Sequence, residues 1–100
     1  MIVNAEIDEI GLYVITHYGT SYVSMILNFD GGRCQVRIPD EDVLKFVRNV
    51  FDYDIPEDGF FLHELEGKYV RVEKDKDGEV CRIGHILRDK WIDIRTIYQV

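Results

Sequence analysis

The most constraining feature of this sequence is YVSMILNFDGGRCQVRI at residues 22–38, where two β-like segments flank Gly31 and Gly32. Neighbouring glycines suit a two-residue hairpin loop because they adopt backbone angles that other residues resist. A turn at these glycines predicts three facing pairs, Phe29 with Cys34, Leu27 with Val36 and Met25 with Ile38. These apolar residues then share one face, so a sheet with one buried face is expected.

Further strands are predicted on both sides of this hairpin. Residues 2–9 and 12–18 are expected to form two strands before it, followed by a turn at residues 19–21. Three more strands are predicted after it, at residues 68–75, 78–87 and 91–97.

One helix is predicted at residues 40–51, because acids lie in its first turn and apolar residues recur with helical spacing. The expected buried stripe consists of Val43, Leu44, Val47, Val50 and Phe51. Residues 52–66 have no clear period and are expected to form a loop with a short helical turn. Together these elements predict an α+β domain spanning residues 1–100, with about five to seven mainly antiparallel strands in a curled or barrel-like sheet.

The beginning of the sequence and its apolar runs bear on location. The first residues lack a basic leader, and no apolar run approaches the roughly 20 residues that a membrane span needs. A soluble, cytoplasmic protein is expected, without membrane contact. Cys34 and Cys81 are then expected to be free, buried thiols.

Charge is distributed unevenly along the chain. The segment from Asp40 to Glu66 contains nine acids and two bases, so it carries the whole net charge of −7, while the other acids and bases balance. Such a field attracts a cationic partner from a distance. It disfavours direct nucleic-acid binding, which needs clustered Lys and Arg. The expected partner is a protein with a basic surface.

The stretch VEKDKDGEVCRIGH at residues 72–85 suggests either a metal site or a turn. Acids at positions 73, 75 and 77 followed by Gly78 match the first part of a calcium loop, but Gly84 stands where the closing bidentate Glu is required. A hairpin about Asp77-Gly78 explains more residues, because it pairs three sets across the strands: Lys76 with Glu79, Glu73 with Arg82 and Val72 with Ile83.

Cys81 and His85 are the candidates for transition-metal or nucleophilic chemistry, with Cys34 or His63 as further members. On one strand, residues four apart stand about 13 Å from each other, too far to share a metal ion unless Gly84 marks a bulge. No nucleophile motif or phosphate-binding loop occurs. We therefore expect no enzymatic activity, no cofactor and no metal. Tyr13, Tyr18, Tyr22 and His17 are expected to contribute either to an exposed aromatic surface or to the core.

Residues 66–94, EGKYVRVEKDKDGEVCRIGHILRDKWIDI, contain the motifs Gly67-Lys68-Tyr69-Val70-Arg71-Val72 and Ile83-Gly84-His85-Ile86-Leu87 with Asp89 and Trp91. This segment resembles the C-terminal part of small uncharacterised phage-encoded proteins, in which a GK-aromatic-VRV strand, a turn and an IGHIL-x-D-x-W strand recur after a short helix. The resemblance implies a phage origin and carries no established activity.

A phage-encoded, acidic chain without catalytic motifs fits a stoichiometric inhibitor whose carboxylates occupy a groove that normally binds DNA or RNA, by analogy with anti-CRISPR proteins. The expected partner-binding residues are Asp40, Glu41, Asp42, Asp52, Tyr53, Asp54, Glu57, Asp58, Phe60, Phe61, Glu64 and Glu66. The alternative is a phage structural or assembly module that forms homo-oligomers through strand edges and aromatic side chains.

Overall fold

The structure is a computed structural model. It describes residues 1–94, except for the side chain of Tyr53. Within this range, six strands form one antiparallel sheet in the order β3-β2-β1-β4-β5-β6. The first three strands, β1 (Ile2–Ile15), β2 (Thr20–Phe29) and β3 (Gly32–Pro39), form a meander. Strands β4 (Tyr69–Lys74), β5 (Val80–Gly84) and β6 (Trp91–Asp93) continue the sheet beyond β1.

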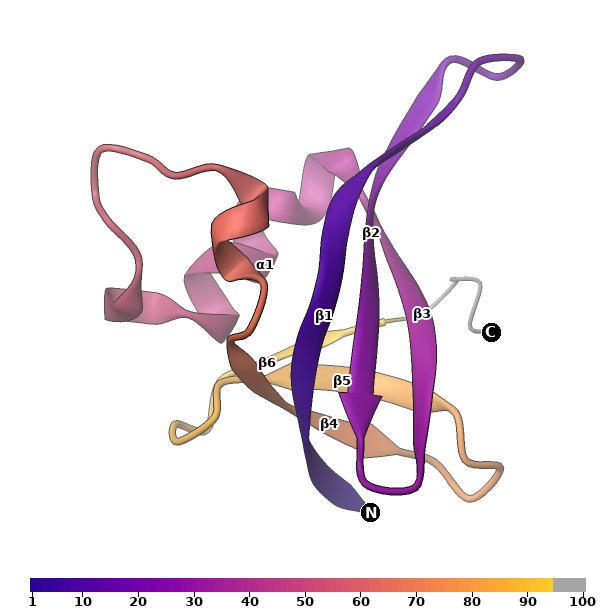
Figure 1. The fold of residues 1–100 in the computed structure, drawn as a ribbon, viewed down its shortest axis with the longest axis vertical. Helices are drawn as coiled ribbons and strands as arrows, with labels where there is room; N and C mark the ends of the chain where they lie inside the picture. The colour runs from indigo at the N-terminus through magenta and orange to yellow at the C-terminus, as the bar shows by residue number, and fades with distance from the viewer. Residues whose placement is uncertain (95–100) are drawn as a thin grey trace.

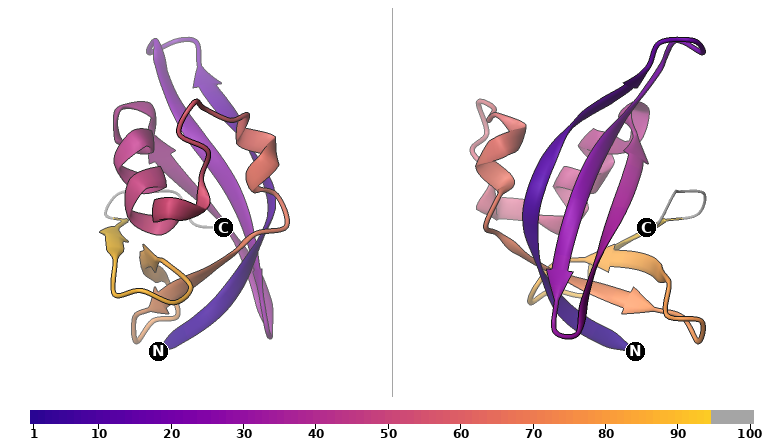
Figure 2. Two further views of the ribbon diagram at one scale, coloured as in Figure 1. Left: turned by 90° about the vertical axis from the view of Figure 1, so that its left-hand side faces the viewer. Right: turned by 45° about the vertical axis from the view of Figure 1, so that its right-hand side comes forward.

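The two halves of the sheet cross at a steep angle, so the sheet is curled (Figure 1). Residues 40–66 cover one face of it and are called the helical layer below (Figure 2). This layer contains α1 (Val43–Val50) and three short 3₁₀ turns, η1 (Asp40–Asp42), η2 (Asp52–Asp54) and η3 (Leu62–Leu65). The predicted α+β class, strand number, curled sheet and helix near residues 40–51 are confirmed.

The core lies between the sheet and the helical layer. Its buried residues include Ile7, Met25 and Leu27 from the meander, Phe46 from α1 and Ile83 from β5. Because these side chains form one cluster, the helical layer and both halves of the sheet bury their apolar faces together. None of the helices among the described residues is long and apolar enough to cross a membrane.

The β2–β3 register differs by two residues from the predicted one. Met25 faces Val36, Leu27 faces Cys34 and Phe29 faces Gly32, so the turn is Asp30-Gly31. Gly31 has the positive φ of 86° that the turn requires, whereas Gly32 lies in the strand with the Phe29 ring against it. A shift of two preserves the faces, so Val36 and Ile38 are still buried.

The two strands predicted at 2–9 and 12–18 are one strand, β1. It is interrupted by a β-bulge at Asp8, and it ends at Ile15. The turn occupies residues 16–19, because Gly19 supplies its positive φ of 65°, so residues 20 and 21 begin β2 and do not form the turn.

The predicted buried stripe of the helix is wrong at one position. Leu44 is exposed, whereas Phe46 is buried and packs edge-on against Phe51. Val43, Phe46, Val47 and Val50 form the covered face of α1, because residues three and four apart lie on the same side of an α-helix, and Leu44 lies outside that face.

Strands β4, β5 and β6 confirm three predicted strands but are shorter than expected. Residues 85–87 leave β5 and form a loop that runs to residue 90. Residues 95–97 of the strand predicted at 91–97 lie outside the described part of the chain.

Candidate functional site

The helical layer holds all of the predicted partner-binding residues, and five of its acids make contacts within the protein. Asp40 accepts a hydrogen bond from the Ser21 hydroxyl, with a distance of 2.6 Å between the oxygens. Glu64 accepts from the backbone N–H of Phe61, which fixes the start of η3. Glu66 accepts from the backbone N–H of Ile10 at 3.2 Å. These three carboxylates therefore help to hold the layer together or attach it to the sheet.

Asp52 and Asp54 attach the layer to the loop at residues 85–90. Asp52 has a positive φ of 51°, and its carboxylate lies 3.1 Å from the Arg88 guanidinium and 3.0 Å from the Lys90 ammonium. Asp54 Oδ2 lies 3.2 Å from Nε2 of His85. A strained backbone persists only where the surroundings hold it, and two cations around a mostly buried carboxylate do so here.

The remaining acids of the segment are Glu41, Asp42, Glu57 and Asp58. Asp42 is half-buried and the other three are exposed. None of the four makes a side-chain hydrogen bond or ion pair with any residue in the described part of the chain. They are therefore the carboxylates of this segment that are available to an external cation.

The two phenylalanines of the predicted site differ in exposure. Phe60 packs against the core, whereas Phe61 is largely exposed and its ring stacks on His63 with centroids 5.7 Å apart. The Tyr53 side chain, also predicted to contribute, lies outside the described part of the structure. Among the described side chains, the layer thus places the exposed phenyl ring of Phe61 close in sequence to Glu57 and Asp58.

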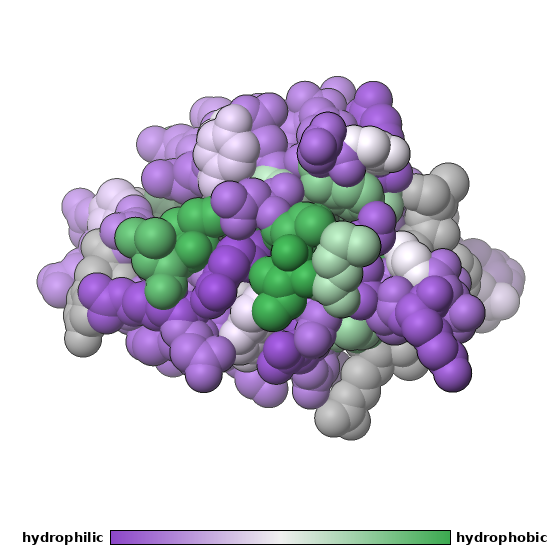
Figure 3. Space-filling model, turned by 90° about the horizontal axis from the view of Figure 1, so that it is seen from below, coloured by the Kyte–Doolittle hydropathy of each residue, from purple (hydrophilic) through white to green (hydrophobic). Residues whose placement is uncertain are grey.

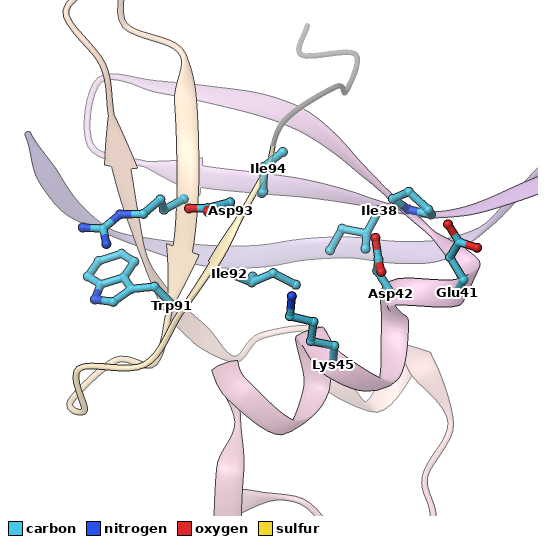
Figure 4. Close-up of a pocket in the computed structure, with 10 residues that line it drawn as sticks. Ile38, Glu41, Asp42, Lys45, Trp91, Ile92, Asp93 and Ile94 are labelled. Carbon is cyan, nitrogen blue, oxygen red and sulfur yellow. The ribbon is translucent and has the colours of Figure 1, made fainter.

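A cavity of about 780 Å³ lies where the start of the helical layer meets β6 (Figure 4). Glu41, Asp42 and Lys45 line it from the layer, and Arg82 and Asp93 line it from the sheet. Trp91 and three isoleucines supply apolar surface. The lining residues within the described part of the chain offer charged and apolar groups, which suit ionic and apolar binding.

The stretch at residues 72–85 forms the predicted hairpin, with Val72 opposite Ile83 and Glu73 ion-paired with Arg82. The turn is one residue longer than predicted. Asp75 pairs with Glu79 through the backbone, and its carboxylate accepts from the N–H groups of Asp77 and Glu79. Gly78 takes a positive φ of 84°. The Asp75 carboxylate therefore organises a turn, since it satisfies backbone donors within the loop.

Cys81 and His85 are held apart by separate contacts. Cys81 Sγ donates to the Glu73 carbonyl oxygen, while His85 is buried beside Asp54. No group of three or more His, Cys, Asp or Glu side chains that could hold a metal ion occurs among residues 1–94. Burial raises the pKa of the Cys34 thiol, an effect only partly opposed by Lys74, and this disfavours the nucleophilic thiolate form.

His85 uses both of its ring nitrogens. Nδ1 accepts hydrogen bonds from the backbone N–H groups of Leu87 and Arg88, both at 3.0 Å. A nitrogen that accepts is unprotonated, so Nε2 carries the hydrogen and donates to Asp54. Neither nitrogen is left to act as a base toward a substrate, and the residue orders the loop that begins with it.

The motif residues of the C-terminal segment converge on this same loop. Arg71 donates to the backbone carbonyls of His85 and Arg88, at 2.7 Å and 2.6 Å. Trp91 donates to Asp89, and its indole lies over Gly84. The role of this motif within the fold is structural: Gly84, His85, Asp89 and Trp91 each make a contact that positions the loop at residues 85–90.

No protein-family model, curated protein or solved structure matches this chain. The resemblance of residues 66–94 to phage-encoded proteins therefore remains a prediction.

A second exposed surface lies on β1, β2 and the turn between them, and the prediction from the tyrosines covered only part of it. Tyr13 and Tyr22 face each other across β1 and β2, with the Arg37 guanidinium 3.9 Å from the Tyr13 ring centre, while Tyr18 is exposed in the turn next to His17. Sequence reasoning missed the exposed Leu12 and Val14 beside them. The sequence does indicate an uncharged surface here, because no Asp, Glu, Lys or Arg occurs between residues 10 and 29.

Proposed function

We propose that this chain is a small, non-enzymatic binding protein that presents its helical layer to a protein with a basic surface. In this proposal it acts in the cytoplasm as a stoichiometric inhibitor, by occupying a groove that otherwise binds the phosphates of DNA or RNA. The carrying observation is that Glu41, Asp42, Glu57 and Asp58 have no partner among the described residues, although five other acids of the same layer do.

The cavity beside η1 supports this proposal. Glu41 and Asp42 form part of its wall, opposite Asp93 and the apolar surface of Trp91 and Ile92 (Figure 4). A lysine or arginine side chain of a partner fits such a site, because its aliphatic stem contacts apolar surface while its charged end meets carboxylates. Lys45 and Arg82 also line the cavity. Because they repel further positive charge, the cavity favours one inserted cation over several.

Exposed apolar side chains on the layer give the interface a source of affinity beyond charge. Phe61 and Leu44 are both exposed there. Aromatic side chains dominate binding energy when they enter a desolvated pocket, whereas rim charges mainly raise the association rate and set its salt dependence. We therefore assign specificity to Phe61 and steering to the four carboxylates.

The absence of catalysis is part of the proposal and is supported by how the reactive groups are used. Both nitrogens of His85 are engaged, Cys81 bonds to a backbone carbonyl and burial raises the pKa of Cys34. In this proposal the carboxylates of the helical layer act as phosphate mimics, by analogy with anti-CRISPR proteins encoded by phages.

A competition assay tests the proposal. Basic DNA- and RNA-binding proteins, each loaded with a fluorescent oligonucleotide, are titrated with this chain, and release is followed by fluorescence anisotropy. We expect the wild type to displace the oligonucleotide from at least one of them, and the variants E41K/D42K and E57K/D58K to lose this ability.

The variant D30K/D77K is the matched control, since it changes the net charge by the same amount at exposed acids outside the layer. It should compete like the wild type, and circular dichroism should show that all three variants fold. A wild type that releases no oligonucleotide, or a control that loses activity as much as the layer variants, contradicts the proposal.

A second candidate function is assembly with further copies of the same chain. It is favoured by the uncharged β1–β2 segment, whose side chains and strand edge are exposed. This surface lies on β1 and β2, outside the helical layer.

A further inference from the structure

Strands β1 and β2 extend beyond the rest of the sheet as a two-stranded ribbon, at the top of Figure 1 and in both views of Figure 2. The neighbour of β2 ends at Pro39, opposite Tyr22, and β4 pairs only with residues 2–6 of β1. Residues 11–22 are called the ribbon here. Among the residues that the structure describes, no strand pairs with the outer edge of β1 at residues 11–15, and residues 14–21 have no third strand on either side.

The ribbon exposes large apolar side chains. Leu12 is 62% exposed and Val14 53%, although both lie on the same face as the buried Ile10. Tyr13 on the opposite face is 40% exposed and Tyr18 in the turn is 76% exposed. The apolar face of the strand thus continues past the point where the helical layer covers it. The opposite end of the molecule is mostly hydrophilic, with separate apolar patches (Figure 3).

The outer edge of β1 also presents backbone hydrogen-bonding groups. The N–H of Ile10 points away from β2, because it donates to the Glu66 carboxylate. Orientation alternates along an antiparallel strand, and the β1–β2 register is regular from residue 9 to residue 15. The N–H and C=O groups of Leu12 and Val14 therefore point away from β2. They lie further along the strand than the hydrogen bond between Ile10 and Glu66, which covers the edge before them.

This edge lacks the protection that natural edge strands usually have. Charged side chains, especially lysine, and prolines commonly prevent one edge from pairing with another. Between residues 10 and 29 the chain has no Asp, Glu, Lys, Arg or Pro. An extended strand is the partner whose chemistry fits, since it would satisfy the free backbone groups and cover the apolar side chains at once.

We propose that a second copy of this chain occupies the ribbon, with residues 11–15 of the two β1 strands pairing antiparallel about a twofold axis. Twofold pairing brings like residues together, so it is disfavoured wherever the surface carries one sign of charge. In a chain with a net charge of −7 the ribbon is neutral, and it is the place where two copies meet without direct repulsion.

The expected interface is small. Tyrosine offers about 150–250 Å² of surface, so the exposed parts of Leu12, Tyr13, Val14 and Tyr18 amount to roughly 400 Å² per copy and about 800 Å² for the pair, the size of a weak, transient contact. The dimer should therefore dissociate on dilution. Sedimentation velocity between about 1 µM and 1 mM covers the range expected for such a contact.

The first test compares two single substitutions that add the same charge at exposed apolar residues. Val14→Lys places a lysine on the ribbon, and Leu87→Lys places one in the loop at residues 85–90. We expect the wild type and Leu87→Lys to dimerise with increasing concentration and Val14→Lys to stay monomeric. A monomeric wild type at 1 mM, or equal dimerisation of the two variants, overturns the proposal.

Hydrogen exchange distinguishes edge pairing from contact through the side chains alone. At high concentration the amides of Leu12 and Val14 should become protected, while those of Tyr13 and Ile15, which point toward β2, should change little. Dimerisation without protection at Leu12 and Val14 overturns the pairing.

Salt separates this proposal from the proposed inhibitory function. Salt screens the repulsion between two chains that are both negative, so dimerisation should strengthen between 50 mM and 500 mM salt, whereas binding of the helical layer to a basic protein should weaken. Each surface can therefore fail its test independently. A dimer that dissociates as salt is raised contradicts pairing through the neutral ribbon.

Discussion

At the scale of single residues, Trp91 and Gly84 belong to one motif in the sequence because the indole packs directly against the glycine. A Cβ on Gly84 would lie 2.6 Å from the Trp91 ring and 2.9 Å from the Lys90 carbonyl oxygen. The guanidinium groups of Arg71 and Arg82 lie 4.9 Å and 4.4 Å from the indole ring centre. The indole needs a residue without a side chain beneath it, and two cations hold it in place.

Replacing Gly84 with alanine should destabilise the protein, because the added methyl group must displace both the indole and a backbone carbonyl. Overpacking of this kind costs about 1–3 kcal/mol. The free energy of unfolding in urea, followed by Trp91 fluorescence, measures the loss. Gly11→Ala is the control, since no atom lies within 4 Å of a Cβ there, and it should change stability by less than about 0.5 kcal/mol. Equal effects of the two substitutions would contradict this role for Gly84.

Sequence alone could predict which acids were concentrated in one segment, but not which of them were already in use. Asp52 and Glu57 look alike in the sequence, yet Asp52 binds Arg88 and Lys90 from the C-terminal loop and Glu57 binds no described residue. That distinction depends on contacts between segments far apart in the chain. Local pattern carries no information about such contacts.

At the scale of elements, the β-bulge in β1 determines which side chains enter the core. Ala5 and Ile7 are buried before it and Ile10 after it, so the inward side chains change from odd to even positions at Asp8. A bulge adds one residue to a strand without changing its partner. Without it, strict alternation would turn Ile10 and Leu12 to the outer face.

Deleting Asp8 should be tolerated, because Ile7, Glu9 and Ile10 then alternate regularly opposite Leu27, Ile26 and Met25. The deletion loses the exposed ion pair with Arg33, which is worth about 0–1 kcal/mol. Thermal unfolding followed by circular dichroism should show a small change.

Deleting Glu6 instead is the matched control, since it removes one acid from the same strand. It forces either Ile7 or Ala5 out of the core, and we expect a loss of about 3 kcal/mol or more. If both deletions destabilise the protein equally, the bulge does not have this role.

The faces of the elements could be predicted more fully than their registers. Alternation along residues 22–38 correctly indicated the buried face, but the ring of Phe29 against Gly32 selects a turn one residue earlier than predicted. The bulge also has a sequence signal, because Ile7 and Ile10 are three residues apart where a regular strand needs two or four. The burial of Phe46 has a sequence signal as well, since Phe46 lies three residues after Val43 and four before Val50.

At the scale of the whole molecule, one core joins the helical layer to both halves of the sheet. Helix α1 packs against β5 and β6, while η3 packs against β1. Buried residues from all of these elements belong to a single cluster. No described part of the chain has an apolar core of its own.

Unfolding should therefore be cooperative. Trp91 fluorescence reports on the β4–β6 half and far-UV circular dichroism on all regular structure, and the two urea transitions should have the same midpoint and slope. The measurement belongs at low concentration, where self-association is negligible. Separate midpoints would mean that the two halves of the sheet unfold independently.

The strand order has a consequence for how the chain folds. Four of the five strand pairings join neighbours in sequence, whereas the pairing of residues 2–6 with residues 69–73 closes a loop that contains the meander and the helical layer. Loop closure costs entropy before its contacts form, and non-local pairing slows folding. We expect the β1–β4 junction to form in the rate-limiting step, so substitutions along it should slow refolding in stopped-flow measurements more than equally destabilising substitutions at the hairpin turns.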